Sequence, residues 1–360
     1  MDENISDLYS LGYFKTLYYE IHPNIDGWVD IIIHVKESSL RKFHLGLRWD
    51  NMYHLIGVAN VQLNTKWIPG VRIEDEIQFA GIQRNEFSIS YPSRRLNFPI
   101  YPYFKIINSR YIFDLYSTVN NFEDSYIHSS DGVRVGLGIL LKNYWNTEFE
   151  YFLNKENFQT ENSLANNSTD LYNPYTIDKK TMSGIRILAK LDLLDDVILP
   201  RDGIMLKGKY EISHNDLGSD RNYDLYQFFG KVYKTFHLNT YGITGYFHHT
   251  LDELPRYLTT IPGGSATFAG TKEFQLHGSS LTFFRLNYRY RHNKDIYAHF
   301  LINWLMNAKS EDSNHITKNI WGFGTGITLS SPVGPMQLIW SWGPGNIYTK
   351  TKLADFVAFL

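Results

Sequence analysis

The sequence contains no cysteine, and it has no uninterrupted apolar segment long enough for a membrane-spanning helix. Without cysteine there are no disulfides, no thiolate metal sites and no cysteine nucleophile. A transmembrane helix needs about 18 or more apolar residues in a row, so that way of crossing a membrane is excluded as well. The net charge is only −2, which removes the electrostatic basis for nucleic-acid binding.

The N-terminus also lacks the basic start and the apolar stretch of a secretory signal. If the protein is exported, we therefore expect this chain to be a processed or truncated form. Aromatic residues, by contrast, are abundant: 26 Tyr, 23 Phe and 8 Trp make up 16% of the chain. A transmembrane β-barrel accommodates many aromatics, because its strands are apolar on one side only and aromatics gather at both membrane interfaces.

Such a barrel requires apolar and polar residues to alternate with period two, and this pattern recurs along nearly the whole chain. A soluble β-sandwich would also alternate. Three features favour a membrane barrel over a soluble fold. The pattern extends along nearly the whole chain, single polar faces carry several charges, and Tyr and Trp lie near strand ends. The clearest case is the segment 284–291, where apolar residues alternate with Arg285, Asn287, Arg289 and Arg291.

The pattern predicts sixteen strands, an even number, as closure of an antiparallel bacterial barrel requires. We therefore predict an all-β fold, a 16-stranded antiparallel transmembrane β-barrel over residues 41–360. The short links should lie in the periplasm and the long ones outside the cell. The predicted strands span residues 42–50, 54–65, 71–81, 85–93, 102–117, 126–140, 144–156, 179–193, 203–214, 223–236, 239–249, 280–291, 295–306, 319–330, 334–343 and 351–360.

Residues 1–38 follow a different pattern. Ile5, Leu8 and Leu11 are spaced by three, which predicts a helix over residues 5–14. Two strands joined by the turn NIDG are expected to follow as a hairpin. A helix and a hairpin are too small for a domain, so we interpret them as the end of a domain whose start lies outside this sequence.

A helix that ends in LYSLGYF (8–14), followed by a hairpin that ends in VKE (35–37), resembles the C-terminal part of a POTRA (polypeptide-transport-associated) module. A POTRA module leading into a 16-stranded barrel resembles the outer-membrane assembly and secretion superfamily, the bacterial surface-antigen family. Three more segments are similar to family features and occur in the correct order. They are PRDGIMLKGKYE (200–211), SPVGPMQLIWSWG (331–343) and the terminal ADFVAFL (354–360).

The resemblance implies that the loop between the eleventh and twelfth barrel strands, residues 250–279, folds back into the lumen. In the family, the tip of this loop carries a Val-Arg-Gly-aromatic motif whose arginine bridges to the barrel wall. Here Ala269 replaces that arginine, and Lys272 could only partly substitute for it, because lysine cannot reproduce a bidentate arginine contact. The candidate motif residues are Phe268, Ala269, Gly270, Thr271 and Lys272.

This departure favours a specialised branch of the superfamily over a general insertion machine. The chain resembles the patatin-like (type V) autotransporters, in which a secreted phospholipase precedes one POTRA module and the barrel. The chain itself carries no Gly-x-Ser-x-Gly elbow of the kind that a patatin-type lipase needs, so an enzyme would lie upstream. We also expect no cofactor and no metal site. His248 and His249 should point to opposite faces of a strand, and Asp192–Asp196 lacks the ligand spacing of a calcium site.

Two further groups are candidate functional residues. Charges on the lumen faces either pair with each other in a hydrated lumen, dock the loop, or line a path for a polypeptide. The first and last strands would close the barrel through few hydrogen bonds, and this seam is a hypothetical gate or homodimer contact. The docking candidates are Arg285, Arg289, Arg291, Glu148 and Glu150, with Arg186 and Lys190 on the same predicted lumen surface. The seam candidates are Phe43, Leu45, Leu47, Phe356 and Phe359.

Three functions remain open at this point. The first is an outer-membrane translocator that secretes or displays its own N-terminal passenger, a patatin-like phospholipase. The second is an insertase or a two-partner secretion pore that acts on other proteins, and the third is a passive porin. The expected partners are outer-membrane lipid, the passenger, the barrel-assembly machinery during biogenesis and a second copy in a homodimer, with the POTRA part in the periplasm.

Overall fold

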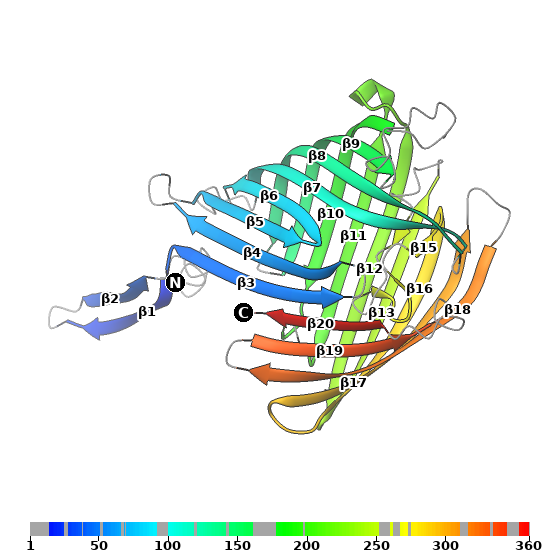
Figure 1. Ribbon diagram of the computed structural model, residues 1–360. Helices are drawn as coiled ribbons and strands as arrows, with labels where there is room; N and C mark the ends of the chain where they lie inside the picture. The colour runs from blue at the N-terminus through cyan, green and yellow to red at the C-terminus, as the bar shows by residue number, and fades with distance from the viewer. Residues whose placement is uncertain are drawn as a thin grey trace.

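Sixteen antiparallel strands form one closed barrel, and a separate two-stranded hairpin precedes it (Figure 1). No helix in the described part of the chain is long and apolar enough to cross a membrane. The structure, a computed structural model, describes residues 14–24, 28–37, 39–50, 53–65, 68, 70–91, 100–118, 121–141, 144–160, 178–196, 199–251, 260–261, 267–272, 275–309, 316–331, 334–343 and 353–359.

The predicted number and order of barrel strands are confirmed, and each strand pairs with its neighbours in the chain. Two short strands, β14 (Thr260–Ile261) and β15 (Leu276–His277), pair with each other in the link between β13 and β16. The barrel strands are β3 (Arg41–Asp50), β4 (His54–Asn64), β5 (Arg72–Ala80), β6 (Ile82–Ser90), β7 (Ile100–Thr118), β8 (Asn121–Leu141), β9 (Trp145–Thr160), β10 (Asp178–Asp192), β11 (Gly203–Ser213), β12 (Tyr223–Phe236), β13 (Asn239–Thr250), β16 (Ser280–Arg291), β17 (Ile296–Lys309), β18 (Ile316–Ser331), β19 (Gly334–Trp342) and β20 (Leu353–Phe359).

The two ends of the barrel are named after the links beside the loop tip. The short-turn end bears the links 193–202, 237–238 and 292–295, and the long-loop end bears the links 214–222 and 251–279. A 3-10 turn, η1 (Asn215–Leu217), lies in the link 214–222. The longest of these links, 251–279, lies at one end, as is typical of barrels of the outer membrane, whose extracellular loops are longer than their periplasmic turns.

The predicted faces of the strands are also confirmed. On β16, Phe284 and Leu286 are exposed on the outside, whereas Arg285 and Arg289 are buried on the lumen side. Successive side chains of a strand point to opposite faces, so each spanning strand presents an apolar side to lipid and a polar side to the lumen. Exposed apolar residues on the outside are therefore the expected lipid contact.

The barrel closes through a short seam between its first and last strands. β20 pairs with β3 at four positions, whereas β12 and β13 pair at twelve. The side chains of Phe43, Leu45 and Leu47 are exposed on the outside. The side chains of Phe356 and Phe359 lie outside the described part of the chain, although their backbone belongs to the seam ladder.

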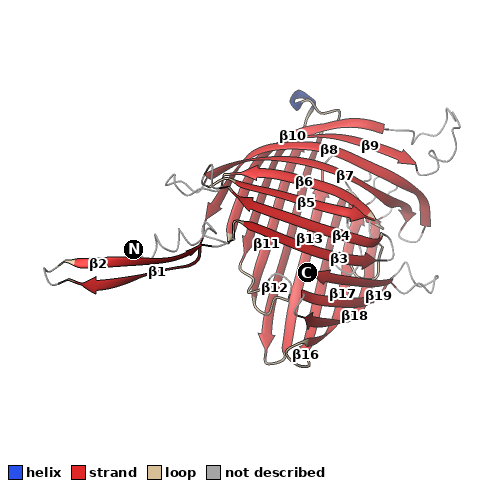
Figure 2. Ribbon diagram, turned by 60° about the vertical axis from the view of Figure 1, so that its left-hand side comes forward, coloured by secondary structure: helices blue, strands red, loops and turns tan. Residues whose placement is uncertain are grey.

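The predicted N-terminal hairpin is confirmed as β1 (Phe14–Pro23) and β2 (Val29–Glu37). Both views show it standing clear of the barrel, beyond the start of β3 (Figures 1 and 2). One of its faces is apolar: Leu17, Tyr19 and Ile21 lie opposite residues of the same kind on β2, most of them exposed. The predicted helix over residues 5–14 falls almost entirely on residues outside the described part of the chain.

Candidate functional site

The link between β13 and β16 carries the predicted motif residues to the inner wall of the barrel. The side chains of Phe268, Ala269 and Thr271 have no measurable exposure. Their neighbours come from the lumen faces of β16, β17, β18 and β19, as described below. We call residues Thr267–Lys272 the loop tip, and the surface that they contact the dock.

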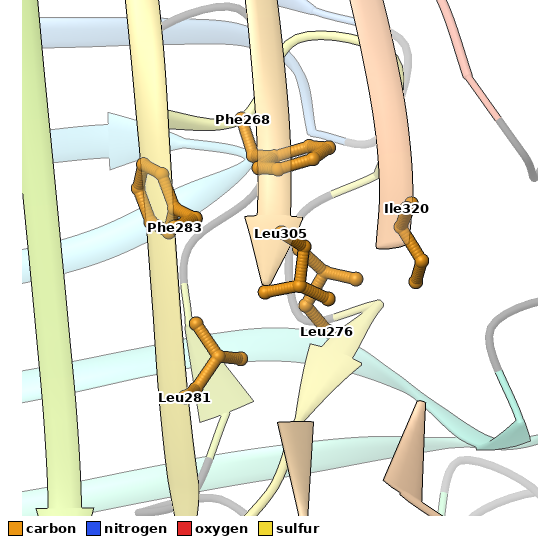
Figure 3. Close-up of a cluster of buried hydrophobic side chains, with 6 residues drawn as sticks. All are labelled: Phe268, Leu276, Leu281, Phe283, Leu305 and Ile320. Atoms are coloured by element: carbon orange, nitrogen blue, oxygen red, sulfur yellow. The ribbon is translucent and has the colours of Figure 1, made fainter. Parts of the chain in front are cut away.

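An apolar cluster holds the first residue of the motif (Figure 3). The ring of Phe268 meets that of Phe283 on β16 edge to face, with centroids 5.6 Å apart. Such aromatic pairs contribute about 0.5–1.5 kcal/mol beyond the burial of their surfaces. The other buried members of the cluster are Leu276, Leu281, Leu305 and Ile320.

Glycines on β18 give the backbone of the loop tip room to approach the wall. A Cβ atom added at Gly322 would lie 2.0 Å from the carbonyl oxygen of Ala269, which is too close for any side chain. A Cβ atom added at Gly324 would lie 3.3 Å from the Cβ of Ala269. Ala269 also packs against Leu301 and Ile339, so its small side chain fits a dock of limited depth.

Gly270, the residue that matches the family motif, has a backbone that only glycine adopts easily. Its φ is +96°, and an added Cβ would lie 2.2 Å from the carbonyl oxygen of Trp342. Both the left-handed conformation and the close approach require a missing side chain. The turn is closed by Thr271, whose hydroxyl donates a hydrogen bond to the carbonyl oxygen of Phe268 at 3.0 Å.

A neutral side chain on β17 binds the backbone of Ala269, the residue that stands where the family has its arginine. The buried Nδ2 of Asn303 donates to the carbonyl oxygens of Ala269 at 3.2 Å and Gly322 at 3.4 Å. This amide therefore joins the loop tip to the wall through the backbone. Lys272 is exposed and makes no ion pair within the described residues, so the structure does not support its predicted role as a substitute.

The predicted docking charges have other partners. Arg289 donates to the carbonyl oxygens of Leu199 and Pro200 in the 193–202 turn, and Arg291 donates to the carbonyl oxygen of Asn293. Arg285 donates to Asn287 at 2.9 Å. The contacts of Arg289 and Arg291 within the described residues are therefore with turns at the short-turn end, and docking of the loop by the arginines stays a prediction.

The two predicted glutamates belong to the wall formed by β7 to β11. Glu148 pairs with Lys105 at 3.3 Å. Glu150 pairs with Arg186 at 2.6 Å, and the same guanidinium reaches Glu211 at 2.5 Å. These charges pair with each other, as expected for a hydrated lumen, whereas the described contacts of the loop tip come from β16 to β19.

The dock residues are not charged, so a search for docking charges does not find them. Their signal is present in the sequence as apolar or glycine residues at positions that alternation assigns to the lumen. A polar lumen face has no reason to carry large apolar side chains unless something apolar covers them. The residues with this signal are Leu281, Phe283, Leu301, Leu305, Gly322, Gly324 and Ile339.

No group of histidine and acidic side chains suited to a metal ion occurs among the described residues. His248 is fully buried on the lumen face of β13, where its Nδ1 lies 3.1 Å from Nε2 of Gln227. Its neighbour His249 lies on the opposite face, as strand geometry requires. The described contacts around the loop tip therefore hold a segment of the chain against the wall of the barrel.

Comparison with protein families shows which superfamily this geometry belongs to. The Omp85 superfamily domain matches residues 73–353, so the chain belongs to the Omp85 superfamily. It is an outer-membrane barrel of the translocator or insertase type.

Solved structures agree on the fold. BamA from Haemophilus ducreyi lacking POTRA domains 1–3 is similar with a TM-score of 0.76 and 13% identity, over 100% of this chain and 78% of that one. CdiB from Acinetobacter baumannii has a TM-score of 0.65 and 10% identity, over 98% and 67% of the two chains. CdiB from Escherichia coli has a TM-score of 0.65 and 10% identity, over 97% and 69%. A search of curated proteins finds no match.

Proposed function

We propose that this barrel is the translocator domain of a protein that secretes or displays its own N-terminal passenger, with a patatin-like phospholipase as the expected passenger. The observation that carries the proposal is the neutral attachment of the loop tip. Phe268 is held by apolar packing, and the backbone of Ala269 is held by the amide of Asn303. A translocator must be able to move this segment aside when a polypeptide passes.

The chemistry of the attachment sets how hard that movement is. Removing one partner of a buried ion pair leaves a bare charge and typically costs about 3–5 kcal/mol. Withdrawing Phe268 forfeits about 1.5–3 kcal/mol of burial, and breaking the bond from Asn303 forfeits about 0.5–1.5 kcal/mol. Withdrawal of the neutral loop tip leaves no charge unpaired, so this attachment is suited to repeated release.

The N-terminal hairpin gives independent support. Its apolar face, which includes Leu17, Ile21 and Ile33, is uncovered in the described part of the chain. A face of this kind belongs to a larger module, and the last hairpin of a POTRA module in the periplasm satisfies that requirement. In this proposal the module connects the barrel to the passenger that precedes it.

A second candidate is a barrel that acts on other proteins, as an insertase or a two-partner secretion pore. Its support is the fold shared with BamA and CdiB. A passive porin has less support, because the buried loop tip occupies part of the lumen.

A reversible lock on the loop tip tests the proposal. The Cβ of Ala269 and a Cβ added at Gly324 would be 3.3 Å apart, close to the range of about 3.5–4.5 Å that a disulfide needs. Ala269→Cys combined with Gly324→Cys therefore ties the tip to β18 when oxidised, in a chain with no other cysteine. We expect the oxidised protein to lose surface display of an epitope-tagged passenger, and reduction to restore it.

The two single-cysteine variants are the controls, since neither can form the lock. Equal display by the oxidised and reduced double variant would show that the loop tip does not need to move. Absence of display in every form, including the parent, would instead contradict the translocator function itself.

A further inference from the structure

Three lysines lie side by side on the lumen faces of β10, β11 and β12. Lys190 and Lys207 are directly opposite each other in the ladder between β10 and β11. Lys231 on β12 is the diagonal neighbour of Lys207, because Lys207 pairs with Phe229 and Lys231 pairs with Met205. Like charges in directly opposite positions destabilise a sheet, so this arrangement needs a compensating partner.

The compensation found in the wall is incomplete. Asp192 binds Lys190 at 2.8 Å. Within the described residues, Lys207 and Lys231 form no ion pair, although Lys207 lies directly opposite Lys190. The next lysine on the same face of β11, Lys209, is by contrast neutralised by Glu211 at 2.8 Å.

The three lysines occupy the half of the lumen near the short-turn end, since β10 ends at Asp192. A hollow of about 350 Å³ adjoins Lys190 and Lys207, and Lys209 and Glu148 also line it. A second hollow beside Lys190, of about 540 Å³, is less suited to an anion, because Glu74, Glu76, Glu86, Glu148 and Asp192 line it. A water molecule has a share of about 30 Å³ in the liquid, so the smaller hollow accommodates a hydrated anion.

We propose that Lys190, Lys207 and Lys231 form an anion-binding site that takes a carboxylate or a phosphate group. Lysine suits such a site, because its ammonium group is a compact charge with three donors on a flexible stem. Charge-assisted hydrogen bonds from two or three ammonium groups hold an oxyanion more strongly than neutral donors do. The site faces the lumen, so its ligand is a free anion or an acidic side chain of a polypeptide inside the barrel rather than a lipid headgroup.

Thermal unfolding of the purified protein in detergent, with inorganic phosphate as the probe, tests the site. Phosphate at constant ionic strength should raise the melting temperature above that in chloride. In the double variant Lys207→Gln, Lys231→Gln, the phosphate concentration that gives half of this shift should rise by about tenfold or more. Lys234→Gln is the matched control, because Lys234 is on the same strand, faces outward and pairs with Asp202.

The double variant should fold, because the substitutions remove repulsion between like charges; in chloride its melting temperature should equal or exceed that of the parent. Equal stabilisation of the parent by phosphate and chloride, or unchanged phosphate dependence in the double variant, would overturn the proposal.

An unfolded poly-glutamate peptide distinguishes the two sources of the anion, a free anion and an acidic side chain of a polypeptide. Displacement of phosphate by the peptide assigns the site to acidic polypeptide segments, and phosphate binding without displacement assigns it to small anions.

Discussion

A single methyl group at Gly322 should release the loop tip while leaving the barrel intact. The Cβ of Gly322→Ala would lie 2.0 Å from the carbonyl oxygen of Ala269 and 3.0 Å from the ring of Phe268. Gly322 lies within β18 and does not need a left-handed backbone, so alanine suits the strand itself. The conflict is therefore confined to the contact between the wall and the loop tip.

The magnitude follows from the contacts that would be lost. Phe268 would give up about 1.5–3 kcal/mol of burial and about 0.5–1.5 kcal/mol from its pairing with Phe283. The hydrogen bond from Asn303 adds about 0.5–1.5 kcal/mol. If the tip instead shifts and stays docked, overpacking costs about 1–3 kcal/mol. We therefore expect docking to weaken by about 3 kcal/mol, which raises the undocked population by about two orders of magnitude.

Thiol labelling measures that population directly, because the chain has no cysteine of its own. Thr271→Cys places a reporter at a fully buried position of the loop tip. Under conditions where opening is fast, the labelling rate is proportional to the fraction of molecules with an undocked tip. We expect Gly322→Ala to speed labelling by about 100-fold.

Gly208→Ala on β11 is the control, since an added Cβ there meets no atom within 4 Å. It should label at the parent rate. If Gly322→Ala also labels at the parent rate, the glycines of β18 do not create the dock, and the argument from the missing side chains is wrong.

Two further substitutions test the two walls of the lumen separately. Asn303→Leu removes the donor to Ala269 and should weaken docking by about 1–2 kcal/mol, seen as roughly tenfold faster labelling of the same reporter. If Asn303→Leu is labelled at the same rate as the parent protein, packing alone holds the loop tip. Arg186→Met should lower the free energy of unfolding by about 1.5–3 kcal/mol, because Glu150 and Glu211 lose the hydrogen bonds of their shared cation, while Lys209 and Arg134 still accompany them. Heat-dependent migration on gels measures this loss. Arg84→Met, which removes the cation of the half-buried Arg84–Glu86 pair, is the comparison and should cost less.

The strands and their faces could be predicted because a spanning strand imposes period two on nearly every residue. Phe284 and Arg285 had to lie on opposite sides whatever the register. The position of the loop between the eleventh and twelfth strands followed from counting. The contacts of the loop tip could not be predicted in this way, because alternation gives the face of a residue and not its neighbour across the barrel.

Register decides which lumen charges pair with each other, and strand spacing alone does not give it. Arg186 lies directly opposite Glu150 on one side and Glu211 on the other, so adjacent strands already satisfy it. A shift of one residue in either ladder would have separated these pairs, and strand ends read from sequence are uncertain by more than that. Charges on neighbouring strands therefore neutralise each other first, and only the unmatched ones are available to a ligand.

The two walls of the lumen thus divide the work between them. The wall of β16 to β19 carries an apolar, glycine-rich dock beside the buried arginines of β16, and this dock holds a segment of the protein's own chain through Phe268 and the backbone of Ala269. The wall of β9 to β12 is charged, and it retains an excess of lysine at Lys207 and Lys231 near the short-turn end. Undocking of the tip changes the first wall only. In the proposed function, a chain that enters the lumen meets the lysine-rich wall directly beside the dock, with only β13 between them, and acidic segments would be retained there.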